Sequence, residues 1–158
     1  MPERHDDYLL EVEDLRTHFF TDEGVVRAVD GVSFGIKAGK TLCVVGESGC
    51  GKSVMARSVH VVGESPGRVV GGKVLMRPEP GVEIDLAALP PNGKRMRSIR
   101  GKLATMIFQE PMTALSPLYT IGNQIIEGIL LHQDVSKKEA REIAIRALGM
   151  TGEVIVPS

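Results

Sequence analysis

The sequence predicts an α/β protein with an antiparallel β portion at its N-terminal end and a helical segment at its C-terminal end. Three observations support this fold class. Alternating polar and apolar residues open the chain, a continuous apolar run leads into a glycine-rich loop near residue 46, and apolar residues recur at helical spacing after residue 120.

Composition places the chain among ordinary folded domains. Its 158 residues carry 19 Lys and Arg against 20 Asp and Glu, a formal net charge of -1, with 42% hydrophobic and 25% charged residues. This balance argues against a dedicated nucleic-acid binder or a polybasic membrane anchor. Two cysteines are too few for a disulfide scaffold, and no uncharged stretch reaches the length of a membrane span.

The first elements are expected to be strands. Residues 8–15 alternate in part, residues 21–24 (T-D-E-G) give a turn signal, and residues 25–29 continue the pattern, which together predict an antiparallel hairpin. Residues 42–45 (L-C-V-V) form an apolar run typical of a strand buried on both faces, with Cys43 in the core. A helical pattern follows from Lys52 to about residue 61.

Between residues 63 and 108 the polar and apolar residues alternate less clearly than at the start of the chain. Glycine-rich residues 63–72 suggest a loop, residues 73–76 and 82–86 suggest short strands, and residues 103–108 form a second buried apolar run. One helical face then carries Ile121, Ile125, Ile126, Ile129 and Leu130. A capping box at residues 136–139 (S-K-K-E) opens a last helix that Gly149 suits as a stop. We therefore divide the chain into a β-rich and loop-bearing part, 1–110, and the beginning of a helical subdomain, 111–158.

One motif carries chemistry. Residues 46–53 match the pattern G-x-x-x-x-G-K-[ST] through Gly46, Glu47, Ser48, Gly49, Cys50, Gly51, Lys52 and Ser53. Glycines let the backbone curl so that its N–H groups cradle phosphates, and the following helix adds its positive end. Lys52 would bind the β- and γ-phosphates of ATP, and the Ser53 hydroxyl would coordinate Mg²⁺.

A plain glycine-rich turn is the alternative explanation of this loop. The apolar run before it and the helical pattern after it provide the context that the motif requires, so we favour phosphate binding. Within the loop, Cys50 reads as a small filling residue, with a thiol of lowered pKa at a helix N-terminus as the alternative.

The second half of the sequence contains a more specific motif than the glycine-rich loop. Residues 106–117 (M-I-F-Q-E-P-M-T-A-L-S-P) resemble the Q-loop of ABC-transporter ATPases, in particular those of the peptide/nickel importer branch. Residues 28–34, 45–49 and 100–102 are similar to flanking pieces of the same branch, so the resemblance covers nearly the whole chain. It implies a P-loop NTPase core that binds ATP and Mg²⁺.

The resemblance also implies two further site residues. Gln109 would be the Q-loop glutamine, whose neutral amide contacts the metal-bound water or the γ-phosphate region; spacing alone would leave it a polar strand end. Phe19 would stack on adenine, although Phe20 is an alternative and either ring could belong to the core. The basic stretch formed by Lys94, Arg95, Arg97, Arg100 and Lys102 reads as a solvated helix face, since aromatics for base stacking are absent.

Parts that the family places after the Q-loop are not found in the sequence. It contains no L-S-G-G-Q-like signature, no apolar strand ending in Asp-Glu and no histidine in the context of the switch histidine. We therefore expect the front part of such an ATPase, truncated inside the helical subdomain. As it stands it should bind ATP–Mg²⁺ weakly and hydrolyse it at no measurable rate.

The resulting hypothesis is an ATP-binding subunit, or a fragment of one, that energises the import of peptides or related small solutes. Its implied partners are transmembrane permease subunits, a second ATPase subunit in a homo- or heterodimer and, indirectly, an extracytoplasmic solute-binding protein, with no nucleic acid. The implied location is the cytoplasmic face of the cell membrane, with residues 111–131 as the docking surface. A non-catalytic nucleotide-binding module and a small stand-alone P-loop NTPase or kinase are the alternatives.

Overall fold

A computed structural model describes residues 8–60, 67–108 and 115–150 of the chain. The chain divides into two compact units, Met1–Leu103 and Ala104–Ser158. Helices α1 (Lys52–Val59) and α2 (Lys94–Ile99) belong to the first unit, and helices α4 (Ile121–His132) and α5 (Lys137–Met150) belong to the second. The functional division expected after residue 110 stays a prediction.

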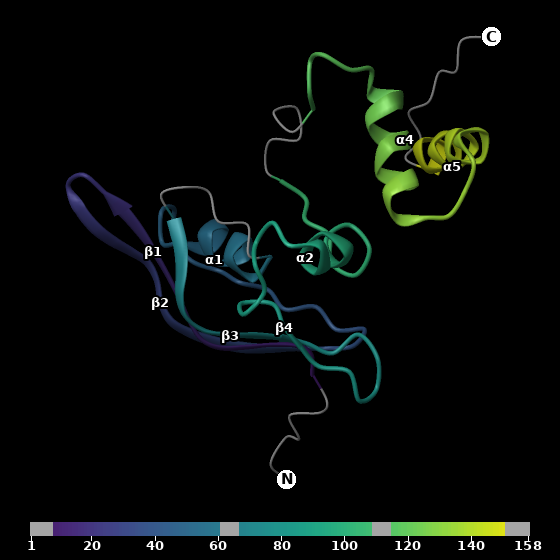
Figure 1. Cartoon of the computed structure of the whole chain (residues 1–158). Helices are drawn as coiled ribbons and strands as arrows, with labels where there is room; N and C mark the ends of the chain where they lie inside the picture. The colour runs from purple at the N-terminus through teal and green to yellow at the C-terminus, as the bar shows by residue number, and fades with distance from the viewer. Residues whose placement is uncertain (1–7, 61–66, 109–114, 151–158) are drawn as a thin grey trace. The chain divides into compact units, whose positions relative to one another are not determined.

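The first unit is built on a four-stranded antiparallel sheet with the order β2-β1-β3-β4 (Figure 1). Its strands are β1 (Tyr8–Thr21), β2 (Gly24–Lys37), β3 (Gly67–Met76) and β4 (Ile84–Asp85). The predicted hairpin is confirmed, because β1 and β2 pair along their whole length up to Thr21 and Gly24. Both strands are longer than the alternation in the sequence suggests, since bulges interrupt the pairing and shift the pattern of exposed side chains.

Part of the glycine-rich segment expected as a loop belongs instead to β3. Residues 67–72 pair with β1, and the register shifts between Glu13 and Arg16 of β1. Gly72 lies at this bulge with φ +89°, where an added Cβ would be 2.4 Å from the Asp14 carbonyl oxygen. The glycines of this segment therefore allow two strands to approach closely at a bulge, a role that a turn-based interpretation of glycine misses.

The buried residues of the first unit come from the sheet and from the chain that follows it. The largest fully buried side chains are those of Val12 and Leu15 in β1, Val74 in β3, Leu86 just after β4, and Met96 in α2. The basic stretch sits on the outside of these buried residues: Met96 and Ile99 are buried, whereas Lys94, Arg95 and Arg97 are exposed. The expectation of a solvated helix face is thus confirmed for α2.

The two apolar runs expected as buried strands are not strands among the described residues. Residues 40–47 and 105–108 have no regular structure. Val45 is 92% exposed and Ile107 is 95% exposed, and Cys43, expected in the core, is exposed as well. An apolar run forms a central strand only where neighbouring strands pair with its backbone. The four described strands pair only with one another, so these runs have no neighbour to complete a parallel sheet.

The second unit contains two amphipathic helices. Thr120 caps α4, its hydroxyl accepting a hydrogen bond from Asn123 N at 3.2 Å, and Gln124 fixes the preceding turn through bonds to the backbone of Ser116 and Tyr119. The predicted face of α4 is only partly covered, because Ile121 and Leu130 remain exposed. Helix α5 buries Ala140 and Ala144, and it continues through Gly149 to Met150 rather than stopping there. Neither these nor the other described helices are long and apolar enough to cross a membrane.

The predicted capping box at the start of α5 is confirmed. Ser136 N donates to Glu139 Oε2 at 2.8 Å, and Glu139 N donates to Ser136 Oγ at 3.3 Å. Hydrogen bonds from the Ser136 side chain and backbone lower the pKa of Glu139 below its usual value. Because the folded-state pKa is depressed, the stabilising contribution is complete above the ordinary glutamate pKa and is lost as the pH falls through the lower, folded-state value.

We expect the start of α5 to open on acidification. Hydrogen exchange at residues 139–142, corrected for the intrinsic pH dependence, should lose protection over that pH interval. In a Glu139→Gln protein, whose amide oxygen can still accept from Ser136 N but cannot be protonated in this range, the protection should change little with acid. Glu142→Gln, an exposed change on the same helix, is the control. Equal pH profiles for the wild-type and Glu139→Gln proteins would contradict the prediction.

Candidate functional site

The glycine-rich loop connects the end of the β1–β2 hairpin to helix α1. Residues 41–50 are exposed, and a turn at Ser48 and Gly49 reverses the chain. Gly49 and Gly51 have φ values of +83° and +93°, which lie in the left-handed region that favours glycine. Cys50 N donates to the Glu47 carbonyl oxygen at 3.4 Å, which closes the turn. The loop therefore has a curled backbone that only glycine at these positions permits without strain.

Gly51 anchors the loop to the sheet. A Cβ on this residue would lie 2.5 Å from the carbonyl oxygen of Ala28 in β2, so the backbone of the two segments is in direct contact. Gly51 is the N-cap of α1, and its carbonyl accepts the first helical hydrogen bond from Met55 N at 2.8 Å. The N–H groups of the first helical turn thus begin at a fixed point beside β2.

Lys52 brings its ammonium group into the concave side of the loop. Nζ donates to the carbonyl oxygens of Gly46 at 2.8 Å and Glu47 at 2.6 Å. Cys50 Sγ lies 3.4 Å from Nζ and is also the nearest atom to a Cβ built on Gly46, at 2.7 Å. The exposed Cys50 thiol therefore lies between Gly46 and the Lys52 ammonium group, and its role as a loop-filling residue stays a prediction.

Helix α1 is tied to the sheet beneath it. Thr17 Oγ1 donates to Ser58 Oγ at 2.7 Å, and Ser58 Oγ donates in turn to the carbonyl oxygen of Val54 at 2.7 Å. Both hydroxyl-bearing residues are buried. No local pattern predicts this pair, because a threonine in a strand and a serine in a helix are common and their contact depends on tertiary packing.

Phe19 and Phe20 lie on opposite faces of β1, because successive side chains of a strand alternate. Phe19 shares the face of Thr17, which is the face that α1 covers. On β3 it lies opposite Gly67, a residue without a side chain. Phe20 is 45% exposed on the other face, with the Arg68 guanidinium 5.8 Å from its ring centre. Of the two rings, Phe19 is therefore the one on the side of the loop-bearing helix.

Of the two remaining residues expected at the site, Ser53 and Gln109, the structure describes only Ser53. Ser53 is exposed in the first turn of α1, so its hydroxyl is accessible. A hydroxyl is the type of oxygen donor that Mg²⁺ accepts beside phosphate oxygens and waters, so the donor fits the expected metal. Within the described residues, no group of three or more His, Cys, Asp and Glu is arranged to hold a metal ion. Gln109 lies outside the described residues.

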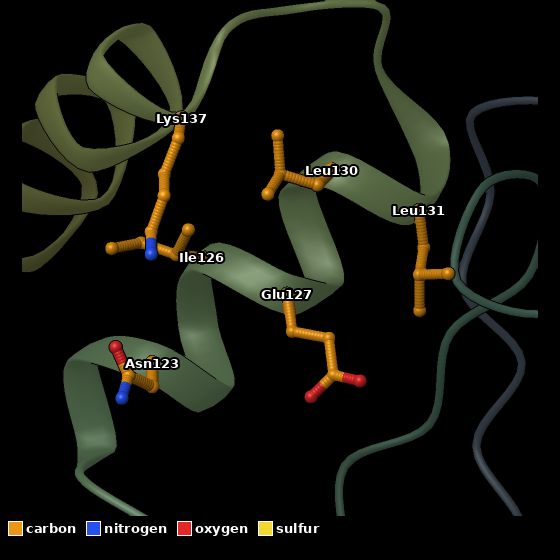
Figure 2. A pocket seen from close by; sticks show the side chains of 6 residues that line it. All are labelled: Asn123, Ile126, Glu127, Leu130, Leu131 and Lys137. Atoms are coloured by element: carbon orange, nitrogen blue, oxygen red, sulfur yellow. The ribbon is translucent and has the colours of Figure 1, made fainter.

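The second unit has a hollow on its α4 surface. A cavity of about 330 Å³ is lined by Asn123, Ile126, Glu127, Leu130, Leu131 and Lys137. Figure 2 shows Lys137 extending from the start of α5 toward Ile126 of α4. The lining combines three exposed or half-buried aliphatic side chains with one acidic and one basic residue.

Comparison with known proteins relates this arrangement to one family. A family model described as "ABC transporter" matches residues 29–155. The chain is 44% identical over 143 residues to the "Probable peptide ABC transporter ATP-binding protein y4tR" of Sinorhizobium fredii, covering 90% of this chain and 41% of that protein. It is 43% identical over 145 residues to the "Oligopeptide transport ATP-binding protein AppD" of Bacillus subtilis, covering 91% and 42%.

Solved structures show the same fold. The dimeric ATP-binding cassette MJ0796 in a post-hydrolysis state with ADP and Pi superposes with a TM-score of 0.73 at 20% identity, covering 92% of this chain and 58% of that one. A second MJ0796 dimer gives a TM-score of 0.75 at 21% identity, with the same coverage. The α/β class with an N-terminal antiparallel portion and following helices is thereby confirmed. The chain spans about two fifths of the length of the curated relatives it matches.

Proposed function

The chain belongs to the ABC transporter family, and from this premise we propose that it is the ATP-binding part of an importer of peptides or related small solutes. The observation that carries the proposal is the loop of residues 46–53 at the start of α1. In this loop the Lys52 ammonium group donates hydrogen bonds to the carbonyl oxygens of Gly46 and Glu47. The printed names of the two relatives above, which concern peptide and oligopeptide transport, support the solute class.

Each residue of the proposed site has a separate task. Backbone N–H groups of the loop would bind the phosphates, Lys52 would turn from the loop carbonyls to the β- and γ-phosphates, and Ser53 would bind Mg²⁺. Bound Mg²⁺ would neutralise phosphate charge. Gln109 would add a contact at the metal and γ-phosphate, and Phe19 would support adenine. The backbone cradle consists of Gly46, Ser48, Gly49, Cys50 and Gly51.

The proposed assembly follows from the same premise. ATP-binding parts of this kind would pair with a second ATPase subunit and dock on transmembrane permease subunits at the cytoplasmic face of the cell membrane, with a solute-binding protein on the other side. We place the permease contact on residues 111–131. The partly uncovered apolar face of α4 and its cavity support this location, since an uncovered apolar face favours a partner.

A titration with fluorescent ATP in the presence of Mg²⁺ tests the proposal and the role of Phe19 together. We expect saturable binding to the wild-type protein. Phe19→Ala should weaken it by up to about 1–3 kcal/mol, the range of base–aromatic stacking. Phe20→Ala is the matched control, and it should leave the affinity near the wild-type value because its ring is on the opposite face of β1.

Absence of ATP binding by the folded wild-type protein would refute the proposed function. Weaker binding by Phe20→Ala than by Phe19→Ala would move the adenine platform to the neighbouring residue and to the other face of the sheet.

A further inference from the structure

The C-terminal end of α1 is held by Arg100, the residue that follows α2. Arg100 Nε and Nη2 donate to the carbonyl oxygen of His60 at 3.1 and 3.0 Å, and Nη1 donates to the carbonyl oxygen of Pro91 at 2.9 Å. His60 is the C-cap of α1, so its carbonyl is at the end where a helix leaves such groups without an internal partner. The guanidinium satisfies this carbonyl with a charged fork and ties it to the turn before α2.

Helix α1 depends on such contacts for its position. It has only 8 residues, and a helix of this length is not stable on its own. Its N-terminal end rests on Ala28 through Gly51, and its last turn is bonded to Thr17 through Ser58. Arg100 supplies a third anchor at the C-terminal end, from a different part of the chain and with a positive charge where the helix dipole is negative.

We propose that Arg100 is a positioning residue for the phosphate loop, an inference that rests on the proposed function. Lys52 and Ser53 are the first two residues of α1, so the direction of the helix fixes the direction of their N–H groups. Release of the His60 end would allow the helix to tilt about Gly51. Hydrogen bonds weaken steeply when their distance and angle leave a narrow range, so a small tilt would weaken phosphate binding.

The experiment compares Arg100→Gln, which removes the fork, with Arg100→Lys, which keeps the charge and a donor. Arg97→Gln is the matched control, because Arg97 is an exposed arginine of α2. Calorimetric titrations with ATP and with inorganic triphosphate should show about fivefold to tenfold weaker binding of both by Arg100→Gln. Arg100→Lys should recover only part of this loss, because a lysine ammonium cannot hold the His60 and Pro91 carbonyls with the same fork, and Arg97→Gln should stay within about twofold of the wild type.

The ratio of the two affinities separates positioning from general loosening. Triphosphate reports on the loop alone, whereas ATP also reports on the adenine platform, which is carried by β1 rather than α1. A positioning role leaves this ratio at its wild-type value, while a loosened sheet would change it. Hydrogen exchange of the α1 amides without nucleotide should rise in Arg100→Gln and return toward the wild-type rate in Arg100→Lys.

The outcomes distinguish the two proposals. A folded wild-type protein that binds neither probe would overturn the proposed function. Wild-type binding together with unchanged triphosphate affinity in folded Arg100→Gln, or with a changed affinity ratio, would overturn the role of Arg100 alone. If Arg100→Gln does not fold, Arg100→Lys decides the matter: triphosphate affinity and α1 exchange both at wild-type values would overturn the inference.

Discussion

Replacing Lys52 with Ala is expected to remove most of the ATP affinity while leaving the chain folded. The ammonium group is the positive charge that the loop holds at its concave side, with carbonyl oxygens at 2.6 and 2.8 Å as partners. A charge-assisted bond to phosphate contributes about 1.5–3 kcal/mol, which corresponds to a loss of roughly tenfold to a hundredfold in affinity. Both existing bonds are at the surface, so their loss should have a small effect on the free energy of unfolding.

The measurement is a titration with fluorescent ATP and Mg²⁺, with circular dichroism to verify folding. Lys40→Ala is the matched control. Lys40 is an exposed lysine just before the loop, and its replacement removes the same charge as Lys52→Ala does. We expect Lys40→Ala to bind like the wild type. Equal affinities of the wild type and a folded Lys52→Ala protein would refute the assignment of the loop as the phosphate site.

The local features were predictable from sequence because a few neighbouring residues determine them. The capping box needs only Ser136 and Glu139, three positions apart, and the structure has both reciprocal bonds. The hairpin needs a turn between two alternating runs, and the structure turns at the expected residues. The position of the loop before α1 likewise follows from its own glycines.

Features that depend on distant partners were not predictable. Residues 42–45 have the composition of a buried strand, but a strand also needs a paired neighbour, and composition does not reveal whether one is present. The glycines of β3 indicated a loop because their bulge against β1 arises from sheet pairing. The anchors of α1 through Thr17 and Arg100 connect residues about forty positions apart, which no local pattern records.

Among the glycines of the loop, Gly51 is the least replaceable. Gly51 has both a φ of +93° and the Ala28 carbonyl oxygen where a Cβ would lie, at 2.5 Å. The obstructing atom belongs to the backbone of β2, so it cannot rotate away as a side chain would. Alanine at this position must therefore displace the start of α1 from the sheet.

We expect Gly51→Ala to lower both stability and ATP affinity. Left-handed backbone strain costs about 1–2 kcal/mol for alanine, and overpacking costs typically about 1–3 kcal/mol more. Gly39→Ala is the control for strain alone, because Gly39 has φ +68° and open space around its Cα, outside the loop.

Thermal unfolding should rank Gly51→Ala below Gly39→Ala, and Gly39→Ala below the wild type. ATP titration should show an affinity loss for Gly51→Ala alone, since only this change moves Lys52 and Ser53. If the two variants unfold at the same temperature, the close contact with Ala28 has no energetic consequence, and if Gly51→Ala binds ATP like the wild type, the phosphate site does not depend on where α1 begins.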